Sequence, residues 1–314
     1  MEELLKLDHV STAFHSRAGL VKAVCDVNFT VAPGQIVGLA GETGCGKSVL
    51  GQTILRLLPP TVEQSGRILF QGKDLMTMNE EEIRAVRGKK IAYINQNPTE
   101  ALNPVLKIGT QLLESLRVCG GLRGGEARRQ ALEILASLSF DDPADIMNKY
   151  PMELSGGMKQ RALTAMAMCG KPPFLIADEP TKGLDALIRG QVIDSLQKFI
   201  DFTGCSGLII THDLKFAGAI CDTLALMYAG EIVEFGPTKK LFAMPKHPYL
   251  SALMAAMPQN GMQVLKGSSC SLIDMPPGCR FADRCEHATE ACRARHPEMR
   301  SVGEDRMVRC LRYD

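Results

Sequence analysis

Short apolar runs alternate with longer helical repeats along the chain, and this pattern predicts a mixed α/β fold. Residues 35–40 form an apolar run typical of a buried central strand, and a glycine-rich loop and a helix over 48–58 are expected to follow it. Further apolar strands are expected at 174–177 and 207–211, with a helix at 188–202 between them. This strand–helix–strand order predicts a parallel sheet covered by helices.

Two parts of the chain depart from that pattern. Between residues 97 and 168 apolar residues recur at helical spacing, for example at Ile108, Leu112 and Leu116, which predicts a helical subdomain. After Phe235 the chain becomes richer in proline and cysteine, which indicates an extension. We therefore expect a main domain over 1–238, which contains the helical subdomain, and a C-terminal extension over 239–314.

The composition narrows the class of protein. The 314 residues are 45% hydrophobic and 23% charged, which is ordinary for a globular protein and argues against disorder. A net charge of +1 predicts no strong attraction to nucleic acid. No apolar run reaches the roughly 18 residues that span a bilayer, and the acidic start 1–4 does not resemble a signal peptide. We expect a cytosolic protein whose 11 cysteines are not a disulfide framework.

A glycine-rich motif predicts a phosphate site. Residues 41–48 fit G-x-x-x-x-G-K-[ST] between a predicted strand and a predicted helix, which is the context that this motif requires. Backbone N–H groups are expected to converge on phosphates, Lys47 to reach the β- and γ-phosphates, and Ser48 to hold Mg²⁺. The alternative is a glycine-rich turn. The predicted nucleotide-binding residues are Gly41, Glu42, Thr43, Gly44, Cys45, Gly46, Lys47 and Ser48.

Two carboxylates follow a second apolar strand. Asp178 and Glu179 come directly after the run 174–177, at the strand end where α/β sheets bind ligands. Asp178 is expected to hold Mg²⁺ through water, and Glu179 to act as general base toward the attacking water. An acidic turn would be the simpler interpretation of this segment alone. The phosphate motif elsewhere in the chain favours the functional interpretation.

Residues 154–160, Leu-Ser-Gly-Gly-Met-Lys-Gln, resemble the signature of ABC-transporter ATPases, with Met158 where the most familiar version has Gln. Other markers of that family follow in its order: the Q-loop Gln96, the D-loop Asp185 and the switch residue His212. Phe14 lies where the family places an aromatic residue that stacks on adenine. By itself the signature predicts a helix cap, or a second anion site at a helix N-terminus.

The resemblance implies a P-loop fold and ATP hydrolysis by two subunits that close on two ATP molecules. It implies catalytic roles for Glu179, His212 and Gln96, and Mg²⁺ contacts from Ser48, Gln96 and Asp178. In the family the signature faces the nucleotide of the other subunit, which here implies Ser155, Gly156, Gly157 and Gln160.

Three segments resemble the dipeptide, oligopeptide and nickel importer branch: residues 96–104, Lys-His-Pro-Tyr at 246–249, and the cysteine-bearing tail. Lys182 departs from the small polar residue that is common there. The branch implies peptide uptake, with nickel or metal-chelate uptake as the alternative. Its partners would be a related ATPase subunit in a heterodimer, two transmembrane permease subunits and, indirectly, an extracytoplasmic substrate-binding protein. The location would be peripheral, on the cytoplasmic face of the inner membrane. A soluble non-transport ABC ATPase and a catalytically silent partner remain alternatives.

Four cysteines of the tail predict a metal site. The spacing Cys-x5-Cys-x6-Cys-x17-Cys contains none of the short Cys-x2-4-Cys pairs that zinc sites favour. Matching cysteines bind a [4Fe–4S] cluster in some members of the branch, so this cofactor is preferred to zinc and to four free thiols. No tail cysteine belongs to the phosphate motifs, so ATP binding is expected without the metal. The expected ligands are Cys279, Cys285, Cys292 and Cys310.

Overall fold

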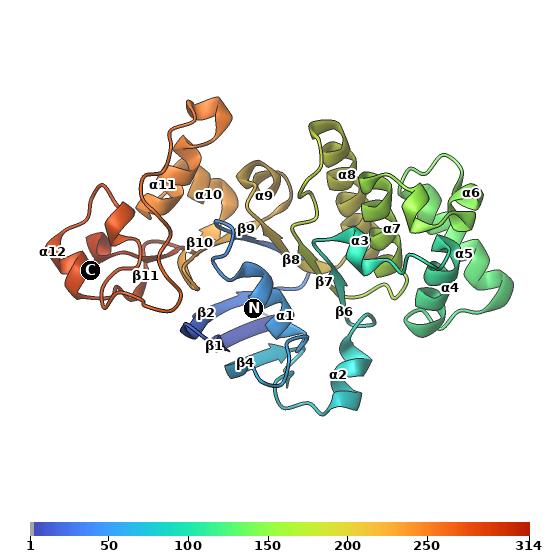
Figure 1. Cartoon of the computed structure of the whole chain (residues 1–314), viewed down its shortest axis with the longest axis horizontal. Helices are drawn as coiled ribbons and strands as arrows, with labels where there is room; N and C mark the ends of the chain where they lie inside the picture. Colours follow the sequence, from blue (N-terminus) through green and yellow to red (C-terminus); the bar gives the residue numbers. More distant parts are fainter. Residues whose placement is uncertain (1–2) are drawn as a thin grey trace. The chain divides into compact units, whose positions relative to one another are not determined.

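A computed structural model describes residues 3–314, apart from the side chains of Ala186, Leu187 and Gln259. The chain divides into two compact units, and each is described here by itself. The first unit contains residues 1–77 and 210–314, and the second contains residues 78–209. Figure 1 shows the elements in chain order, from blue to red.

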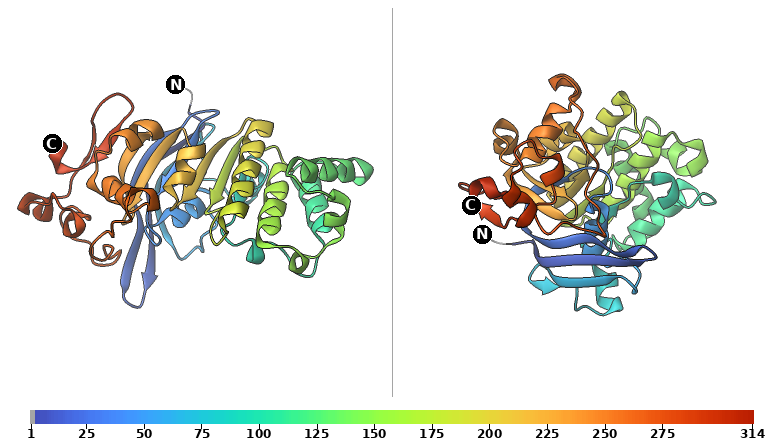
Figure 2. Two further views of the ribbon diagram at one scale, coloured as in Figure 1. Left: turned by 90° about the horizontal axis from the view of Figure 1, so that it is seen from above. Right: turned by 60° about the vertical axis from the view of Figure 1, so that its left-hand side comes forward.

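The N-terminal part of the first unit is an antiparallel sheet with the strand order β2-β1-β4-β5. Leu5 and Leu7 of β1 are buried, because alternate residues of a strand lie on the same face, and an irregularity between Leu7 and Val10 returns Val10 to the buried side. The long β1–β2 hairpin is blue in Figure 2. The strands are β1 (Leu5–Ser16), β2 (Gly19–Val31), β4 (Glu63–Phe70) and β5 (Lys73–Asp74).

The second sheet of this unit has the order β11-β12-β10-β9-β3. Strand β3 pairs in parallel with β9, while β9, β10, β12 and β11 pair antiparallel in sequence. All five residues of β3 are buried, as its continuous apolar run predicts. The strands are β3 (Ile36–Ala40), β9 (Thr223–Tyr228), β10 (Glu231–Pro237), β11 (Met299–Ser301) and β12 (Met307–Arg309).

Short helices complete the first unit. Helix α1 ends at Ile54 and not at residue 58 as predicted, since Arg56 takes a φ of +50°, outside the helical region. The helices are α1 (Lys47–Ile54), α9 (Leu214–Ile220), α10 (Thr238–Ala243), α11 (Pro248–Ala255) and α12 (Glu290–Ala294). Single 3₁₀ turns lie at Pro258–Asn260, Ala282–Arg284 and Leu311–Tyr313.

The second unit contains the strand order β8-β7-β6, of which β6 and β7 pair in parallel. Strands are present at both predicted positions, β7 (Phe174–Asp178) and β8 (Ser206–Thr211), and β6 spans Ile91–Ile94. Helices α4, α5 and α6 form a group that is green in Figure 1. The helices are α2 (Glu80–Val86), α3 (Pro98–Ala101), α4 (Ile108–Val118), α5 (Gly124–Ser137), α6 (Pro143–Asn148), α7 (Gly156–Met168) and α8 (Ala186–Thr203), with a 3₁₀ turn at Pro151–Glu153.

None of the helices within the described part of the chain has both the length and the apolar character needed to cross a bilayer.

Candidate functional site

The glycine-rich loop connects the buried strand β3 to helix α1, as the motif requires. Gly41 and Gly46 take φ values of +156° and +107°. A Cβ atom would come within 2.2 Å of the Met227 carbonyl oxygen at Gly41 and within 2.0 Å of the Ala23 carbonyl oxygen at Gly46. Only glycine therefore fits at these two positions, because the loop passes directly against neighbouring backbone.

The ammonium group of Lys47 lies against carbonyl oxygens of the glycine-rich loop. Its side chain is buried, and its Nζ donates to the carbonyl oxygens of Gly41, at 2.8 Å, and Glu42, at 2.9 Å. Thr43 and Gly44 are exposed and Ser48 is half-buried at the start of α1. A cation beside the N–H groups of a helix N-terminus is a site for phosphate oxygens.

The thiol of Cys45 lies in the interior of the same loop. Burial raises the pKa of Cys45, so the side chain is a neutral thiol at physiological pH. Cys45 therefore contributes its backbone to the loop and no charge.

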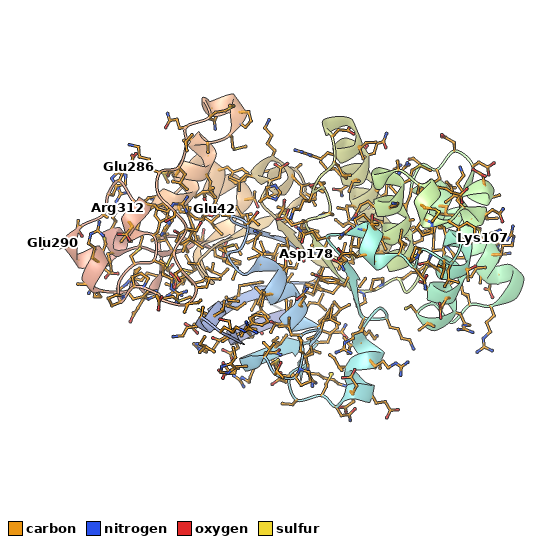
Figure 3. The ribbon with its side chains drawn as sticks, viewed as in Figure 1. Glu42, Lys107, Asp178, Glu286, Glu290 and Arg312 are labelled. Atoms are coloured by element: carbon orange, nitrogen blue, oxygen red, sulfur yellow. The ribbon has the colours of Figure 1, made fainter. Side chains whose placement is uncertain are left out.

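The two predicted carboxylates stand at the end of β7 in the second unit, where Asp178 is labelled in Figure 3. Asp178 and Glu179 are only 2% and 5% exposed. The hydroxyl of Tyr93, on the neighbouring strand β6, donates to Oδ2 of Asp178 over 2.9 Å. Glu179 has a φ of +46°, a backbone conformation that is uncommon outside glycine and that tends to occur at functional sites.

Sequence reasoning missed Tyr93. The residue lies in a short apolar strand, where a tyrosine has no motif of its own, and only the β6–β7 register places it beside Asp178. The half-buried Gln96 follows β6 by two residues, as Asp178 ends β7. Because β6 and β7 are parallel, Gln96 and the two carboxylates emerge at the same end of this strand pair.

His212 and Phe14 belong to the first unit. His212 is exposed directly after β8. Phe14 is half-buried within β1, where it pairs with Val21.

The signature segment forms the N-terminus of helix α7. Ser155 is its N-cap, and the Oγ atom accepts a hydrogen bond from the Met158 N–H over 3.3 Å. Ser155 and Gly156 are exposed, so this helix N-terminus is accessible. Gly157 is buried against helix α8, and a Cβ there would lie 2.4 Å from Cγ2 of Ile188.

Gln160, the last residue of the predicted signature, differs from Ser155 in its exposure. Its side chain is 2% exposed, and its Nε2 has no hydrogen-bond partner among the described residues. Gln160 lies three residues after Gly157, which places both on the buried face of the helix. The structure does not place Gln160 on the accessible end with Ser155.

Asp185 caps the next helix. Its Oδ1 accepts from the Ile188 N–H at 3.0 Å at the start of α8, and the side chain is exposed. The predicted D-loop residue is therefore an N-cap with a free outer surface.

The four tail cysteines line one small cavity of about 20 Å³, together with His247, Phe281 and Leu311. Burial raises the pKa of Cys279 to about 12 and also raises the pKa values of Cys285 and Cys310. Backbone N–H groups two residues further on oppose this by hydrogen bonding to the three sulfurs. These N–H groups belong to Phe281, His287 and Arg312.

The cavity is a poor site for one metal ion. Across the described part of the chain, no three His, Cys, Asp or Glu side chains come close enough together to hold a metal ion. Zinc thiolate sites need four sulfurs about 2.3 Å from one centre, which is a much tighter group. Among the described residues the four cysteines therefore line one small cavity without forming a metal-binding group.

Comparisons with known proteins agree with this geometry. Residues 24–182 match the model of the family described as "ABC transporter", and residues 233–292 match "Oligopeptide/dipeptide transporter, C-terminal region". A relative from Brucella abortus, named a peptide import ATP-binding protein, is 41% identical over 99% of this chain and 98% of its own length.

Solved structures are similar as well. The dimeric ATP-binding cassette MJ0796, in a post-hydrolysis state with ADP and Pi, is 26% identical with a TM-score of 0.66, over 74% of this chain and 98% of its own. The fold also matches cbiO1 from Clostridium perfringens, part of a complex named cbiONQ, with a TM-score of 0.64 at 24% identity. That match covers 82% of this chain and 95% of the other.

Proposed function

Because the chain belongs to the ABC-transporter ATPase family, we propose that it is the ATP-hydrolysing subunit of an importer of dipeptides and oligopeptides. Its membership of this family makes the chain an ATPase, so the proposal concerns its cargo and its assembly. The observation that carries the proposal is the match of residues 233–292 to the C-terminal region of oligopeptide and dipeptide transporters. The name of the Brucella abortus relative supports the same cargo.

The proposed mechanism assigns one task to each group of residues. Lys47 and the loop amides bind the phosphates, and Glu179 takes a proton from the attacking water. His212 contacts the γ-phosphate. Ser48, Gln96 and Asp178 would hold Mg²⁺, which offsets charge on the phosphates, and the buried carboxylate of Asp178 suits this role. Phe14 stacks on the adenine.

The proposed assembly contains a second ATPase subunit. The accessible N-terminus of α7, at Ser155 and Gly156, would face the nucleotide of a related but non-identical partner, and Asp185 would lie at the same interface. Residues 97–168 would form the helical subdomain that contacts two permease subunits. The complex would lie at the cytoplasmic face of the inner membrane and receive its cargo from an extracytoplasmic binding protein. Residues 1–238 would form the ATPase domain and residues 239–314 the extension.

Reconstitution tests this assembly. The chain is co-expressed with the membrane proteins that neighbouring genes encode, purified, and placed in liposomes with the binding protein. We expect co-purification with two polytopic subunits, and ATP hydrolysis that rises severalfold when the binding protein carries a peptide. Stimulation by nickel or a metal chelate alone would reassign the cargo. Purification without any membrane subunit would favour a non-transport ATPase.

We further propose that Cys279, Cys285, Cys292 and Cys310 hold one [4Fe–4S] cluster. Four thiols around one cavity match the ligand number of such a cluster. The role would be structural, because ATP hydrolysis contains no redox step.

Metal analysis of anaerobically purified protein tests the cluster. We expect about four irons per chain, and loss of the iron together with loosening of the tail in Cys285→Ser. Cys205→Ser is the matched control, because Cys205 is a buried thiol outside the cavity and should keep the iron. One zinc per chain, or no metal in protein never exposed to oxygen, would contradict the proposal.

A further inference from the structure

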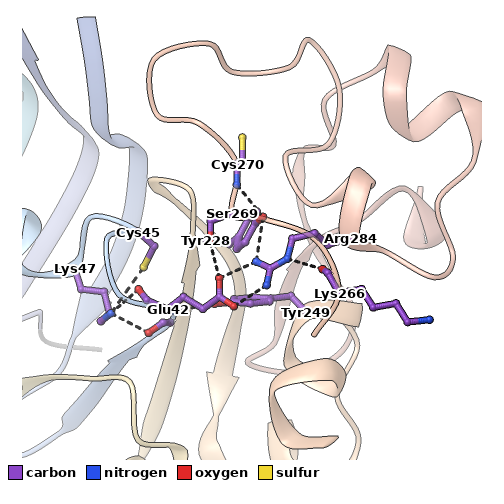
Figure 4. A network of polar contacts seen from close by, with 10 residues as sticks. Glu42, Cys45, Lys47, Tyr228, Tyr249, Lys266, Ser269, Cys270 and Arg284 are labelled. Carbon is purple, nitrogen blue, oxygen red and sulfur yellow. Dashed lines mark hydrogen bonds and ion pairs between the residues drawn. The ribbon is translucent and has the colours of Figure 1, made fainter. Parts of the chain in front are cut away.

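The C-terminal extension contacts the phosphate loop directly through Glu42, within the first unit (Figure 4). The guanidinium of Arg284 donates from Nη1 to Oε2 of Glu42 over 2.7 Å and from Nη2 to Oε1 over 2.9 Å. This two-bond contact has a fixed geometry, because both groups are planar. The Arg284 side chain is only 5% exposed and that of Glu42 25%. It is therefore a partly buried ion pair and not a surface one.

Two further groups of the extension hold the same loop residue. The Ser269 hydroxyl donates to Oε2 of Glu42 over 3.0 Å. The backbone N–H of Glu42 donates to the hydroxyl of Tyr249 over 2.9 Å, and Tyr249 is fully buried. The extension thus fixes both the side chain and the backbone of Glu42.

Glu42 also contacts the central cation of the site. Its carbonyl oxygen accepts from Nζ of Lys47 over 2.9 Å. The polar groups of one loop residue therefore connect Lys47 on one side with Arg284 and Tyr249 on the other. A displacement of Glu42 would move the oxygen that orients the Lys47 ammonium.

Arg284 is itself held in place before ATP binds. It lies in the 3₁₀ turn Ala282–Arg284, and its Nε donates to the Lys266 carbonyl oxygen over 3.1 Å. The guanidinium lies 5.8 Å from the ring centre of Tyr228 and 6.0 Å from that of Phe281. Tyr249 packs against both rings, at 4.8 and 5.3 Å between centroids. Because the aromatic rings and the carbonyl oxygen already restrain the Arg284 side chain, it loses little conformational entropy when it binds a carboxylate.

The charge of Glu42 also needs compensation. The hydrogen bonds from Arg284 are the largest cause that lowers the pKa of Glu42, so the carboxylate is ionised at neutral pH. A carboxylate in a loop that binds the phosphates of ATP would repel them. The Arg284 cation offsets this negative charge.

We propose that Arg284 and Tyr249 are positioning residues of the ATP site. They hold Glu42 so that the loop amides and Lys47 face the phosphates, and Arg284 also neutralises the one carboxylate of the loop. The inference rests on ATP binding at this loop and not on the identity of the cargo or on the cluster.

A double-mutant cycle on the full-length chain tests the electrostatic part. ATP affinity is measured by calorimetry for Arg284→Met, in the natural chain and in a Glu42→Gln background. We expect the Arg284 change to weaken ATP binding about tenfold in the natural chain, because it leaves a carboxylate uncompensated beside the phosphates. In the Glu42→Gln background the same change is expected to cost less than about threefold.

Steady-state kinetics and a matched arginine variant distinguish a positioning role of Arg284 from a general effect on folding. In Arg284→Met we expect the KM for ATP to rise with kcat within about twofold, since the catalytic base is untouched. Arg293→Met removes a tail arginine whose ion-pair partner is Asp283, and its ATP affinity should equal that of the natural chain. Arg284→Lys should recover part of the ATP affinity, because lysine restores the positive charge but cannot form the two parallel hydrogen bonds of a guanidinium.

Tyr249→Phe tests the backbone contact and keeps the ring packing. We expect ATP binding about three- to tenfold weaker, because the Glu42 N–H loses its buried acceptor. Unchanged affinity in both Arg284→Met and Tyr249→Phe would overturn the proposal. So would an equal cost of the Arg284 change in both backgrounds. If Arg284→Met does not fold, Tyr249→Phe decides alone. Failure of the natural chain to bind ATP would instead overturn the ATPase assignment.

Discussion

The phosphate loop and the cysteine-rich tail, residues 279–314, lie in the same unit but are built differently. The loop takes its shape from backbone: a fully buried strand, two glycines pressed against neighbouring carbonyls, and a helix start. The tail has two three-residue strands, and its fully buried apolar residues are few, such as Phe281 and Val308. The loop is therefore specified locally, whereas the tail depends on side chains that reach other segments.

Ion pairs show how the tail is held. Glu231 and Glu234 on β10 are buried carboxylates. Arg306 donates to Oε1 of Glu234 over 2.6 Å. Oε2 of Glu231 lies 2.8, 3.5 and 3.8 Å from nitrogens of three tail residues, His296, Arg280 and Arg309. A segment with little apolar surface thus depends on buried charge pairs, and on a cluster if one is bound.

The largest expected effect tests the backbone origin of the loop. Gly46→Ala places a Cβ where the Ala23 carbonyl oxygen stands, at a φ of +107°, so the loop must move. We expect no saturable ATP binding by calorimetry and no hydrolysis. Gly44→Ala is the matched control: its φ of +84° is also strained for alanine, but no heavy atom outside the two neighbouring residues lies within 4 Å of the new Cβ. Nearly equal binding by both variants would show that side chains, and not the backbone path, define the loop.

The next effect separates ATP binding from chemistry. Glu179→Gln keeps the shape of the side chain and removes the base. We expect hydrolysis to fall by a factor of about 10² to 10⁴ while ATP binding persists. Steady-state hydrolysis and equilibrium binding on the same preparation measure both. The iron content of the tail should not change. Hydrolysis near that of the natural chain would place the base elsewhere.

Local motifs predicted the parts of the fold that depend on nearby residues. The strands β3, β7 and β8, the loop between β3 and α1, and the carboxylates at the end of β7 all follow from continuous apolar runs and motif spacing. The sequence pattern predicted the end of α1 too late along the chain. Arg56 leaves the helical region, and the neighbouring residues contain no signal that predicts this. Gln160 was matched to a motif, but helical periodicity turns it inward.

Contacts between distant segments could not be predicted. Tyr93 reaches Asp178 only through strand register, and Arg284 is 242 residues away from Glu42. In sequence the tail cysteines are independent of the phosphate motifs, yet Arg284, directly before Cys285, holds the loop. Side-chain pairing over such separations depends on the folded structure, for which a single sequence contains no local signal.

The smallest expected effects concern two arginines of the tail, Arg306 and Arg309. They differ in how many other cations contact the carboxylate with which each arginine pairs. Arg306 and Glu234 are 6% and 0% exposed, and Arg306→Met leaves Glu234 with backbone N–H donors from Lys246 and His247 but with no cation from the described residues. We expect the free energy that is needed to open the tail to fall by about 3 kcal/mol. In Arg309→Met, Glu231 keeps Arg280 and His296, so we expect about 1 kcal/mol.

Methionine retains most of the buried volume of each side chain, so the comparison isolates charge from packing. Hydrogen exchange of the β12 amides measures opening of the tail without unfolding the whole chain. Arg300→Met is the control, because Arg300 pairs with Asp314 at a half-exposed position and should cost little. Equal losses for Arg306→Met and Arg309→Met would show that the tail is held by packing or a bound cluster and that its buried charges are interchangeable. A larger loss at Arg306 would show that each buried carboxylate of β10 needs at least one cation from the tail.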